Sequence, residues 1–251
     1  MYTKIKSPVE VERMRKAGYI CSQVLKTLKD TVSPDMSTKY LADLATETIS
    51  RLGGKPSFLG YKDFPDVLCI SINDEIVHGI PSKTRIIQKG DIITFDLGVT
   101  YEGMIVDSAV SVLVDSDDPD KLRLLKATKA SLNNGLKSLK GGCTVGDVGS
   151  AIEAILKQHG LGIIRDLVGH GVGHQVHEDP NIPNYGVPRS GPELSTGMTV
   201  AIEPMATLGG EGIYIDSDGW TVKTRDGSLS AHFEQTVLIT PKGCEILTPF
   251  K

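Results

Sequence analysis

Asp96 and Asp107 are the residues most suited to chemistry, because each lies in a stretch too apolar for a solvated acidic face. Residues 92–99 and 104–114 are rich in β-branched side chains, and a short polar break containing a glycine separates them. This pattern predicts two strands joined by a turn, which would bring the two carboxylates onto one face. The plainer interpretation is two exposed acids near a loop.

The expected turn fixes how the two acids face each other. A turn centred between Tyr101 and Glu102 would set Asp96 directly opposite Asp107, with Cβ atoms about 4.5–5.5 Å apart. Like charges in that relation destabilise a sheet unless they share a proton or bind a cation. We therefore expect this hairpin to carry a shared proton or a bound cation.

Residues 169–180, with the sequence GHGVGHQVHEDP, hold His170, His174 and His177. The glycines allow close backbone approach or positive φ angles, and they argue against a helix that would pair His170 with His174. The helical HExxH zinc motif is absent from this sequence. We predict a strand or loop, with a turn held by structural hydrogen bonds as the alternative.

Glu234 precedes an apolar strand-like stretch at 236–239, where an unpaired carboxylate would be costly to bury. A metal or another partner is implied, with a surface position as the alternative. With Glu203, which the repeat described below matches to Asp96, there are four carboxylates. Four carboxylates and one imidazole suit a pair of divalent transition ions, because hard oxygens can bridge two metals and a nitrogen adds affinity. Two such ions would lower the pKa of a bridging water and stabilise both the attacking and the leaving group of a nucleophilic displacement.

Capping signals predict four helices in two pairs. They are the Ser7–Glu10 capping box with Pro8, a cap at Ser37 or Thr38, Asp118 before Pro119, and Thr144. The second pair repeats the first, with corresponding residues 107 positions apart. The matches are Gly53 with Gly160, Gly90 with Gly197, and Asp96 with Glu203.

This repeat indicates an internal duplication. A pseudo-symmetric fold would bring Asp96 and Glu203 to equivalent places around one axis. We predict an α+β protein whose residues 1–251 form one domain, built from halves at about 1–114 and 115–251.

Composition excludes several classes of protein. The hydrophobic share of 39% and the charged share of 23% are typical of a globular domain. With 27 basic and 31 acidic residues and no dense basic run, nucleic-acid binding is not expected. The four cysteines are scattered and no apolar run is long enough to span a membrane, so we expect a cytoplasmic protein.

The ordered set Asp96, Asp107, His170, Glu203 and Glu234, within CISINDEIVHGIP, GHGVGHQVHEDP, AIEPM and DGWTVKT, resembles the type I methionine aminopeptidases. The resemblance covers essentially the whole chain. It implies the pita-bread fold, a curved antiparallel sheet with two pseudo-symmetric helix pairs on its outer face. The short stretch before the first predicted helix and the short spacing from His177 to Glu203 fit the bacterial-like short form.

The resemblance also implies roles for residues. Asp96 would chelate one metal, Asp107 and Glu234 would bridge both, and His170 with Glu203 would complete the other. A hydroxide between the metals would attack the carbonyl of an N-terminal methionine, with Glu203 as the proton shuttle. His177 would polarise that carbonyl, and His78 would contact the scissile amide and the second residue.

The methionine pocket would come from Tyr61, Phe64, Cys69 and Trp220, and Asn73 with Ser230 would lie near a monovalent cation. The metals would be Co, Mn, Fe, Ni or Zn. The substrate would be the initiator methionine of nascent polypeptides with a small second residue. A monomer and an association with the ribosome are also implied.

Three positions depart from the family pattern. Val176 stands where an aromatic is common, His174 where the residue is often basic or variable, and Phe233 replaces a common tyrosine. Proline-specific dipeptidases and aminopeptidase P share the five ligands, but they normally carry a large extra N-terminal domain. Non-enzymatic relatives typically lose ligands, and in creatinase-like members the ligand positions diverge. A metal-binding but catalytically weak paralogue remains the main alternative.

Overall fold

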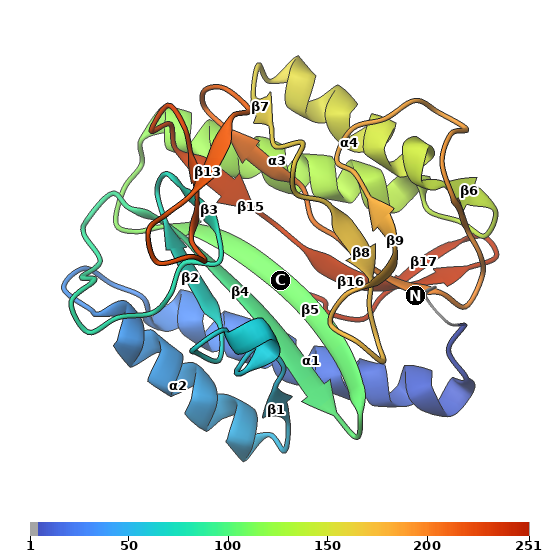
Figure 1. Cartoon of the computed structure of the whole chain (residues 1–251), viewed down its shortest axis with the longest axis horizontal. Helices are drawn as coiled ribbons and strands as arrows, with labels where there is room; N and C mark the ends of the chain where they lie inside the picture. Colours follow the sequence, from blue (N-terminus) through green and yellow to red (C-terminus); the bar gives the residue numbers. More distant parts are fainter. Residues whose placement is uncertain (1–4, 251) are drawn as a thin grey trace.

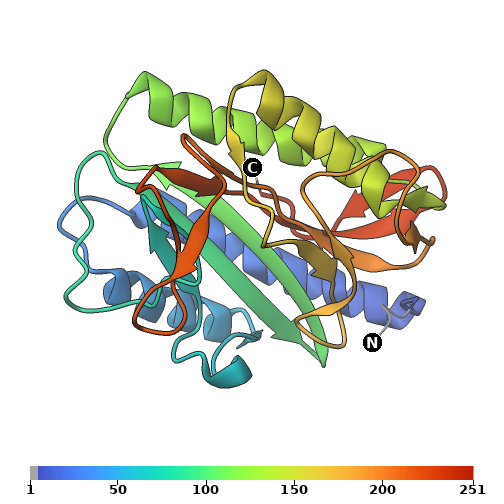
Figure 2. The same cartoon turned by 45° about the horizontal axis from the view of Figure 1, so that its top comes forward.

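The computed structural model describes residues 5–250. Curved antiparallel strands lie between two helix pairs, α1–α2 on one side and α3–α4 on the other (Figure 1). The turned view shows the long β4–β5 hairpin crossing over α1 (Figure 2). None of the helices within these residues combines the length and apolar character that crossing a membrane requires.

The four helices begin where their capping signals predict. The first helix, α1 (Pro8–Thr31), has the complete Ser7–Glu10 capping box, and Ser37 rather than Thr38 caps α2 (Thr38–Arg51). Asp118 caps α3 (Pro119–Ser138), and a second capping box at Thr144 opens α4 (Val145–Gln158). In each case a side-chain oxygen accepts a hydrogen bond from an otherwise unpaired backbone N–H of the first turn.

The central hairpin consists of β4 (Ile92–Tyr101) and β5 (Met104–Leu113), and its predicted register is wrong by one residue at the turn. The turn is centred between Glu102 and Gly103, which have φ angles of 45° and 82°. A two-residue hairpin turn that matches the strand twist needs such positive φ angles. A turn centred between Tyr101 and Glu102, as expected from the sequence, would not place Gly103 at one of its two central positions.

The corrected register changes how the two aspartates are related. Asp96 lies opposite Ala109, and Asp107 lies opposite Gly98, so the acids are not directly opposed. They remain on one face of the hairpin as diagonal neighbours, and a shared cation can still connect them.

The strands that follow α4 form further antiparallel sheets. The strand β11 (Thr199–Ile202) pairs with β16 (Gln235–Thr240) and β8 (Gly169–Gly171), while β9 (Glu178–Ile182) and β17 (Gly243–Ile246) lie at the edges. A three-stranded sheet contains β7 (Gly162–Ile163), β12 (Met205–Thr207) and β15 (Ser230–His232).

Shorter elements complete the fold. The remaining elements are β1 (Lys55–Pro56), the 3₁₀ turn η1 (Tyr61–Asp63), β2 (Cys69–Ile72), β3 (Glu75–Val77), β6 (Cys143–Thr144), β10 (Glu193–Leu194), β13 (Ile213–Ile215) and β14 (Val222–Thr224). The strand β2 pairs with β4, and β14 joins β3 to β13.

Hydrogen bonds join β5 to the segment around Glu234. The N–H of Glu234 donates to the carbonyl of Ala109 at 2.9 Å, and the N–H of Asp107 donates to Thr236 Oγ1 at 2.9 Å. Thr236 Oγ1 donates in turn to the carbonyl of Asp107 at 2.8 Å. These bonds fix the distance between two acids that are 127 positions apart in the sequence.

Equivalent features recur at the 107-residue offset. The helices α2 and α4 match at both ends, and α1 and α3 match at their last residues. Gly90 and Gly197, with φ angles of 88° and 90°, precede the strand that carries Asp96 and the strand that leads to Glu203. One hydrophobic cluster includes residues from all four helices and from the strands between them.

Candidate metal centre and substrate pocket

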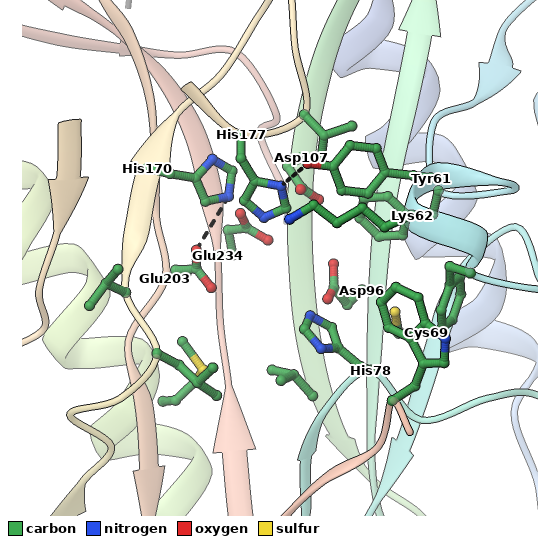
Figure 3. A pocket seen from close by; sticks show the side chains of 18 residues that line it. Tyr61, Lys62, Cys69, His78, Asp96, Asp107, His170, His177, Glu203 and Glu234 are labelled. Carbon is green, nitrogen blue, oxygen red and sulfur yellow. Dashed lines mark hydrogen bonds and ion pairs between the residues drawn. The ribbon is translucent and has the colours of Figure 1, made fainter. Parts of the chain in front are cut away.

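One pocket brings together the residues for which the sequence predicts metal, catalytic or substrate roles (Figure 3). Its lining includes Tyr61, Phe64, Cys69, His78, Asp96, Asp107, His170, His177, Glu203, Trp220 and Glu234. Asn73 and Ser230 lie outside this lining. They contact each other, because Ser230 Oγ donates to the carbonyl oxygens of Asn73 and Glu75, both at 2.9 Å.

One side of the pocket, called the acidic wall here, combines four carboxylates and one histidine from separate strands. Asp96 comes from β4, Asp107 from β5 and His170 from β8, whereas Glu203 directly follows β11 and Glu234 directly precedes β16. All but Glu203 are buried, and the Glu203 side chain is 12% exposed. Several carboxylates therefore meet in a space with little access to water.

Burial makes these carboxylates unusually basic. It is the main cause that raises the pKa of Asp96, Glu203 and Glu234 well above the ordinary range, and the charge of Asp107 adds to the effect on each. Burial likewise raises the pKa of Asp107 to about 7. Without a cation, such a group of anions is strongly disfavoured at neutral pH.

The donor atoms fit a divalent cation. One ligand atom each from Asp107, His170 and Glu234 lie within 4.8 Å of one another. Asp107 Oδ1 is buried and lacks a hydrogen-bond partner among the described residues. His170 Nδ1 lies 2.9 Å from the carbonyl of Gly171, which favours a proton on Nδ1 and leaves Nε2 free to coordinate. His170 Nε2 lies 3.4 Å from Glu203 Oε1.

His177 and His78 face the same pocket from other directions. Tyr61 stacks on His177 with ring centroids 5.5 Å apart, and its hydroxyl lies 2.9 Å from His177 Nδ1. Burial lowers the pKa of His177, and it lowers that of His78 to about 4. Both rings are therefore neutral at pH 7, so each has one N–H for a ligand or for the protein.

The loop that carries His177 is anchored from behind. The Glu178 carboxylate accepts from the N–H groups of His174 and Gln175 and from Lys6 Nζ, at 2.7, 3.1 and 2.9 Å. The side chains of Lys6 and Glu178 are 0% and 3% exposed. Gly173 has a φ of 146°, and a Cβ there would come 2.3 Å from the Lys6 side chain. These contacts explain why glycine is needed in this stretch and what holds the loop.

An apolar compartment adjoins the acidic wall. Phe58, Phe64, Cys69 and Val176 form a buried cluster, and Tyr61 and Trp220 pack against it as partly buried members. Phe64 and Trp220 meet edge to face with ring centroids 5.1 Å apart. Val176, which departs from the family pattern, is 3% exposed within this cluster.

The sequence analysis missed several residues here, among them Phe58, Lys62 and His232. Phe58 and Lys62 line the pocket, yet they stand outside the quoted motifs, where only proximity to Tyr61 and Phe64 could have indicated them. His232 lies buried behind Glu203, with its Nε2 3.5 Å from Glu203 Oε2. Its position two residues before Glu234 was the available signal.

The curved sheet with two equivalent helix pairs, together with a buried cluster of carboxylates and histidine, defines a metallopeptidase of the pita-bread class. Comparison with known proteins supports this assignment. The model of metallopeptidase family M24 matches residues 12–241, so the chain belongs to that family, and within it to the methionine aminopeptidases. The family implies divalent metal ions.

The similarity to relatives extends over the whole chain. A methionine aminopeptidase of Aquifex aeolicus is 43% identical over 99% of both chains, and methionine aminopeptidase 1 of Bacillus subtilis is 42% identical over 97% of this chain and 98% of its own. The crystal structure of a methionine aminopeptidase from Thermotoga maritima has a TM-score of 0.96 and 41% identity, covering 98% of this chain and 99% of its own.

A prolidase shares the fold at lower sequence identity. A prolidase from Pyrococcus furiosus has a TM-score of 0.79 and 24% identity, and the aligned region covers 99% of this chain but only 66% of the prolidase. This likeness confirms the pita-bread fold and carries no argument about the substrate.

Proposed function

We propose that this protein removes the N-terminal methionine from polypeptides whose second residue is small. The observation that carries the proposal is the buried carboxylate and histidine cluster directly beside the apolar compartment of Phe58, Phe64 and Cys69. A peptide bond placed at the cluster would leave the first side chain in that compartment. The relatives named above act on methionine according to their names.

Five residues would hold two divalent ions: Asp96, Asp107, His170, Glu203 and Glu234. Asp107 and Glu234 would bridge the two positions, a role that suits carboxylates with two oxygens each. When bound, the ions supply Lewis acidity and lower the pKa of water. The identity of the metal, among Co, Mn, Fe, Ni and Zn, belongs to this proposal.

The remaining roles follow from position and protonation. The thioether of methionine packs against the rings of Phe64 and Trp220 with little strain, because its side chain is unbranched. His177, neutral and oriented by Tyr61, would donate from Nε2 to the carbonyl oxygen as negative charge develops there. Glu203, with its raised pKa, would carry a proton to the leaving amine, and His78 would contact the scissile amide.

Further proposals concern the setting of the enzyme. The four cysteines are free, which fits the reducing cytoplasm. We propose a monomer formed by a single domain whose halves are about 1–114 and 115–251, acting on nascent chains at the ribosome. A monovalent cation near the carbonyl of Asn73 would have to share that oxygen with Ser230.

The test is release of free methionine from a Met-Ala-Ser peptide by metal-stripped protein, before and after Co²⁺ or Mn²⁺ is added. Activity should appear only with metal, and Asp107→Ala and Glu234→Ala should remove both activity and tight metal binding. A folded protein that binds the ions but releases no methionine would instead be a catalytically weak paralogue. Wild-type turnover in either variant would place the centre elsewhere.

A further inference from the structure

His232 is a buried imidazole that has no role in the proposed reaction. It ends β15 and is 1% exposed, and neither ring nitrogen has a hydrogen-bond partner among residues 5–250. Its backbone N–H donates to Ser111 Oγ at 2.9 Å, and Ser111 Oγ donates to its carbonyl, which fixes the start of the side chain. A buried polar group without a partner is costly, so its retention calls for a specific role.

The polar group facing His232 is Glu203. His232 Nε2 lies 3.5 Å from Glu203 Oε2, while His170 Nε2 lies 3.4 Å from Glu203 Oε1. Glu203 is thus placed between two imidazoles, one at each carboxylate oxygen. The 3.5 Å separation is just beyond the usual range of about 2.7–3.2 Å for an N–H···O hydrogen bond. A small rotation of either side chain would close it.

The two imidazoles lie on different sides of Glu203. His170 lines the pocket together with Asp107 and Glu234, whereas His232 is not part of the pocket lining. His170 therefore faces the space where a metal would be held, and His232 approaches Glu203 from the protein interior. Outer partners of this kind orient a ligating carboxylate and influence how strongly it binds the metal.

We propose that His232 is a positioning residue that donates its Nε2–H to Glu203 Oε2 and so leaves Oε1 as the oxygen available to the metal centre. The inference rests on the proposed role of Glu203 as a ligand. A carboxylate held through one oxygen cannot rotate freely, so its metal-binding oxygen is presented in one direction. The same bond would hold Glu203 in place when it moves a proton.

Matched variants separate this role from simple packing. His232→Leu keeps bulk but removes the donor, and His232→Gln keeps a side-chain N–H. Binding of Mn²⁺ to metal-stripped protein, measured by calorimetry, should weaken about 10–100-fold in His232→Leu and recover largely in His232→Gln. The kcat for a Met-Ala-Ser peptide should fall in His232→Leu with little change in KM. Wild-type Mn²⁺ affinity in a folded His232→Leu would overturn the proposal, as would a His232→Gln variant no better than His232→Leu.

The wild-type protein offers a test that needs no substitution. In a ¹⁵N-histidine NMR spectrum of the Zn²⁺-loaded protein, His232 should show the neutral tautomer with its proton on Nε2. A proton on Nδ1, or an Nε2 shifted by direct coordination to zinc, would contradict the donation to Glu203. Neither the calorimetry nor the spectrum depends on methionine release, so failure of the proposed enzymatic function would be recognised separately.

Discussion

At the scale of single residues, the least expected contact is the one between Tyr61 and His177. The Tyr61 hydroxyl lies 2.9 Å from His177 Nδ1, and when the hydroxyl donates, the ring proton is on Nε2, the nitrogen proposed to face the substrate carbonyl. Tyr61, which the sequence assigns to the methionine pocket, thus also orients the His177 ring through stacking and a hydrogen bond.

The first prediction is that Tyr61→Phe lowers kcat about five- to tenfold, the effect of losing one hydrogen bond of about 1–1.4 kcal/mol. Stacking on His177 should survive, so metal content should not change. Steady-state kinetics with a Met-Ala-Ser peptide and metal analysis of the same sample measure both. Tyr19→Phe, at a half-exposed position on α1, is the control and should match the wild type. A drop in metal content would assign Tyr61 to the metal centre instead.

The sequence predicts which residues gather in the pocket better than it predicts how they touch. Eleven residues expected there do line it, because their types and order are those of a known family. Phe58 and His232 were missed, since their roles depend on contacts that only the fold creates. The roles assigned to the eleven remain predictions.

At the scale of elements, the turn of the β4–β5 hairpin decides how Asp96 and Asp107 are related. Both turn residues have positive φ angles, and Gly103, at 82°, is in a conformation that side chains with a Cβ rarely adopt. A Cβ at Gly103 would meet nothing within 4 Å. Any penalty at this position therefore comes from the backbone alone.

The second prediction is that Gly103→Ala lowers the free energy of unfolding by about 1–2 kcal/mol, the cost of a left-handed non-glycine residue. Gly243→Ala is a matched control, because that glycine also has open space around it but no positive φ. It should be neutral or slightly stabilising. Urea denaturation measures both variants. Equal effects would show that the turn lies elsewhere, as in the register first expected from the sequence.

The third prediction concerns the anchor of the His177 loop. Lys6→Met should cost about 3–5 kcal/mol, because it leaves the Glu178 carboxylate buried without its cation. Arg13→Met is the control, since it breaks an exposed ion pair with Glu102 and should cost less than about 1 kcal/mol. Urea denaturation of both variants measures the difference. Similar losses would mean that the Lys6 pair contributes no more than a surface pair.

The elements themselves were largely predictable. Local signals such as the Ser7 and Thr144 capping boxes determine where helices begin, so all four predicted helices occur with these caps. The turn register was not predictable by the same means, because Glu102-Gly103 lacks the usual Asn or Asp before glycine. The Lys6–Glu178 pair joins residues 172 positions apart, a separation at which sequence patterns say little.

At the scale of the whole molecule, the proposed metal centre draws its residues from segments far apart in the sequence. Asp107 and Glu234 are 127 positions apart, and hydrogen bonds from the backbone and from the Thr236 side chain beside β5 hold them together. The charges gathered there oppose folding at neutral pH, because burial favours the protonated carboxylates. A bound cation reverses that cost, so folding of the whole domain and metal binding should depend on each other.

The last prediction concerns how the stability gained from metal binding changes with pH. The folded-state pKa of Asp107, about 7, lies above its ordinary value of 3.8, so its contribution to stability is complete below the ordinary value and is lost as pH rises through about 7. Asp96, Glu203 and Glu234 shift in the same direction. Mn²⁺ displaces these protons, so it should stabilise the protein more at about pH 7.5 than at about pH 5.

The measurement is the Tm of metal-free and Mn²⁺-loaded protein at both pH values. At about 100 times the Kd, the ion should add about 2.7 kcal/mol. At a fixed ion concentration the Tm gain should shrink at the lower pH, because protons then compete for the same oxygens. Asp107→Asn should flatten the pH dependence of the metal-free protein and reduce the gain at both pH values. An equal or larger gain at about pH 5 would mean that the buried carboxylates are already ionised without metal, and that other charges of the fold compensate them.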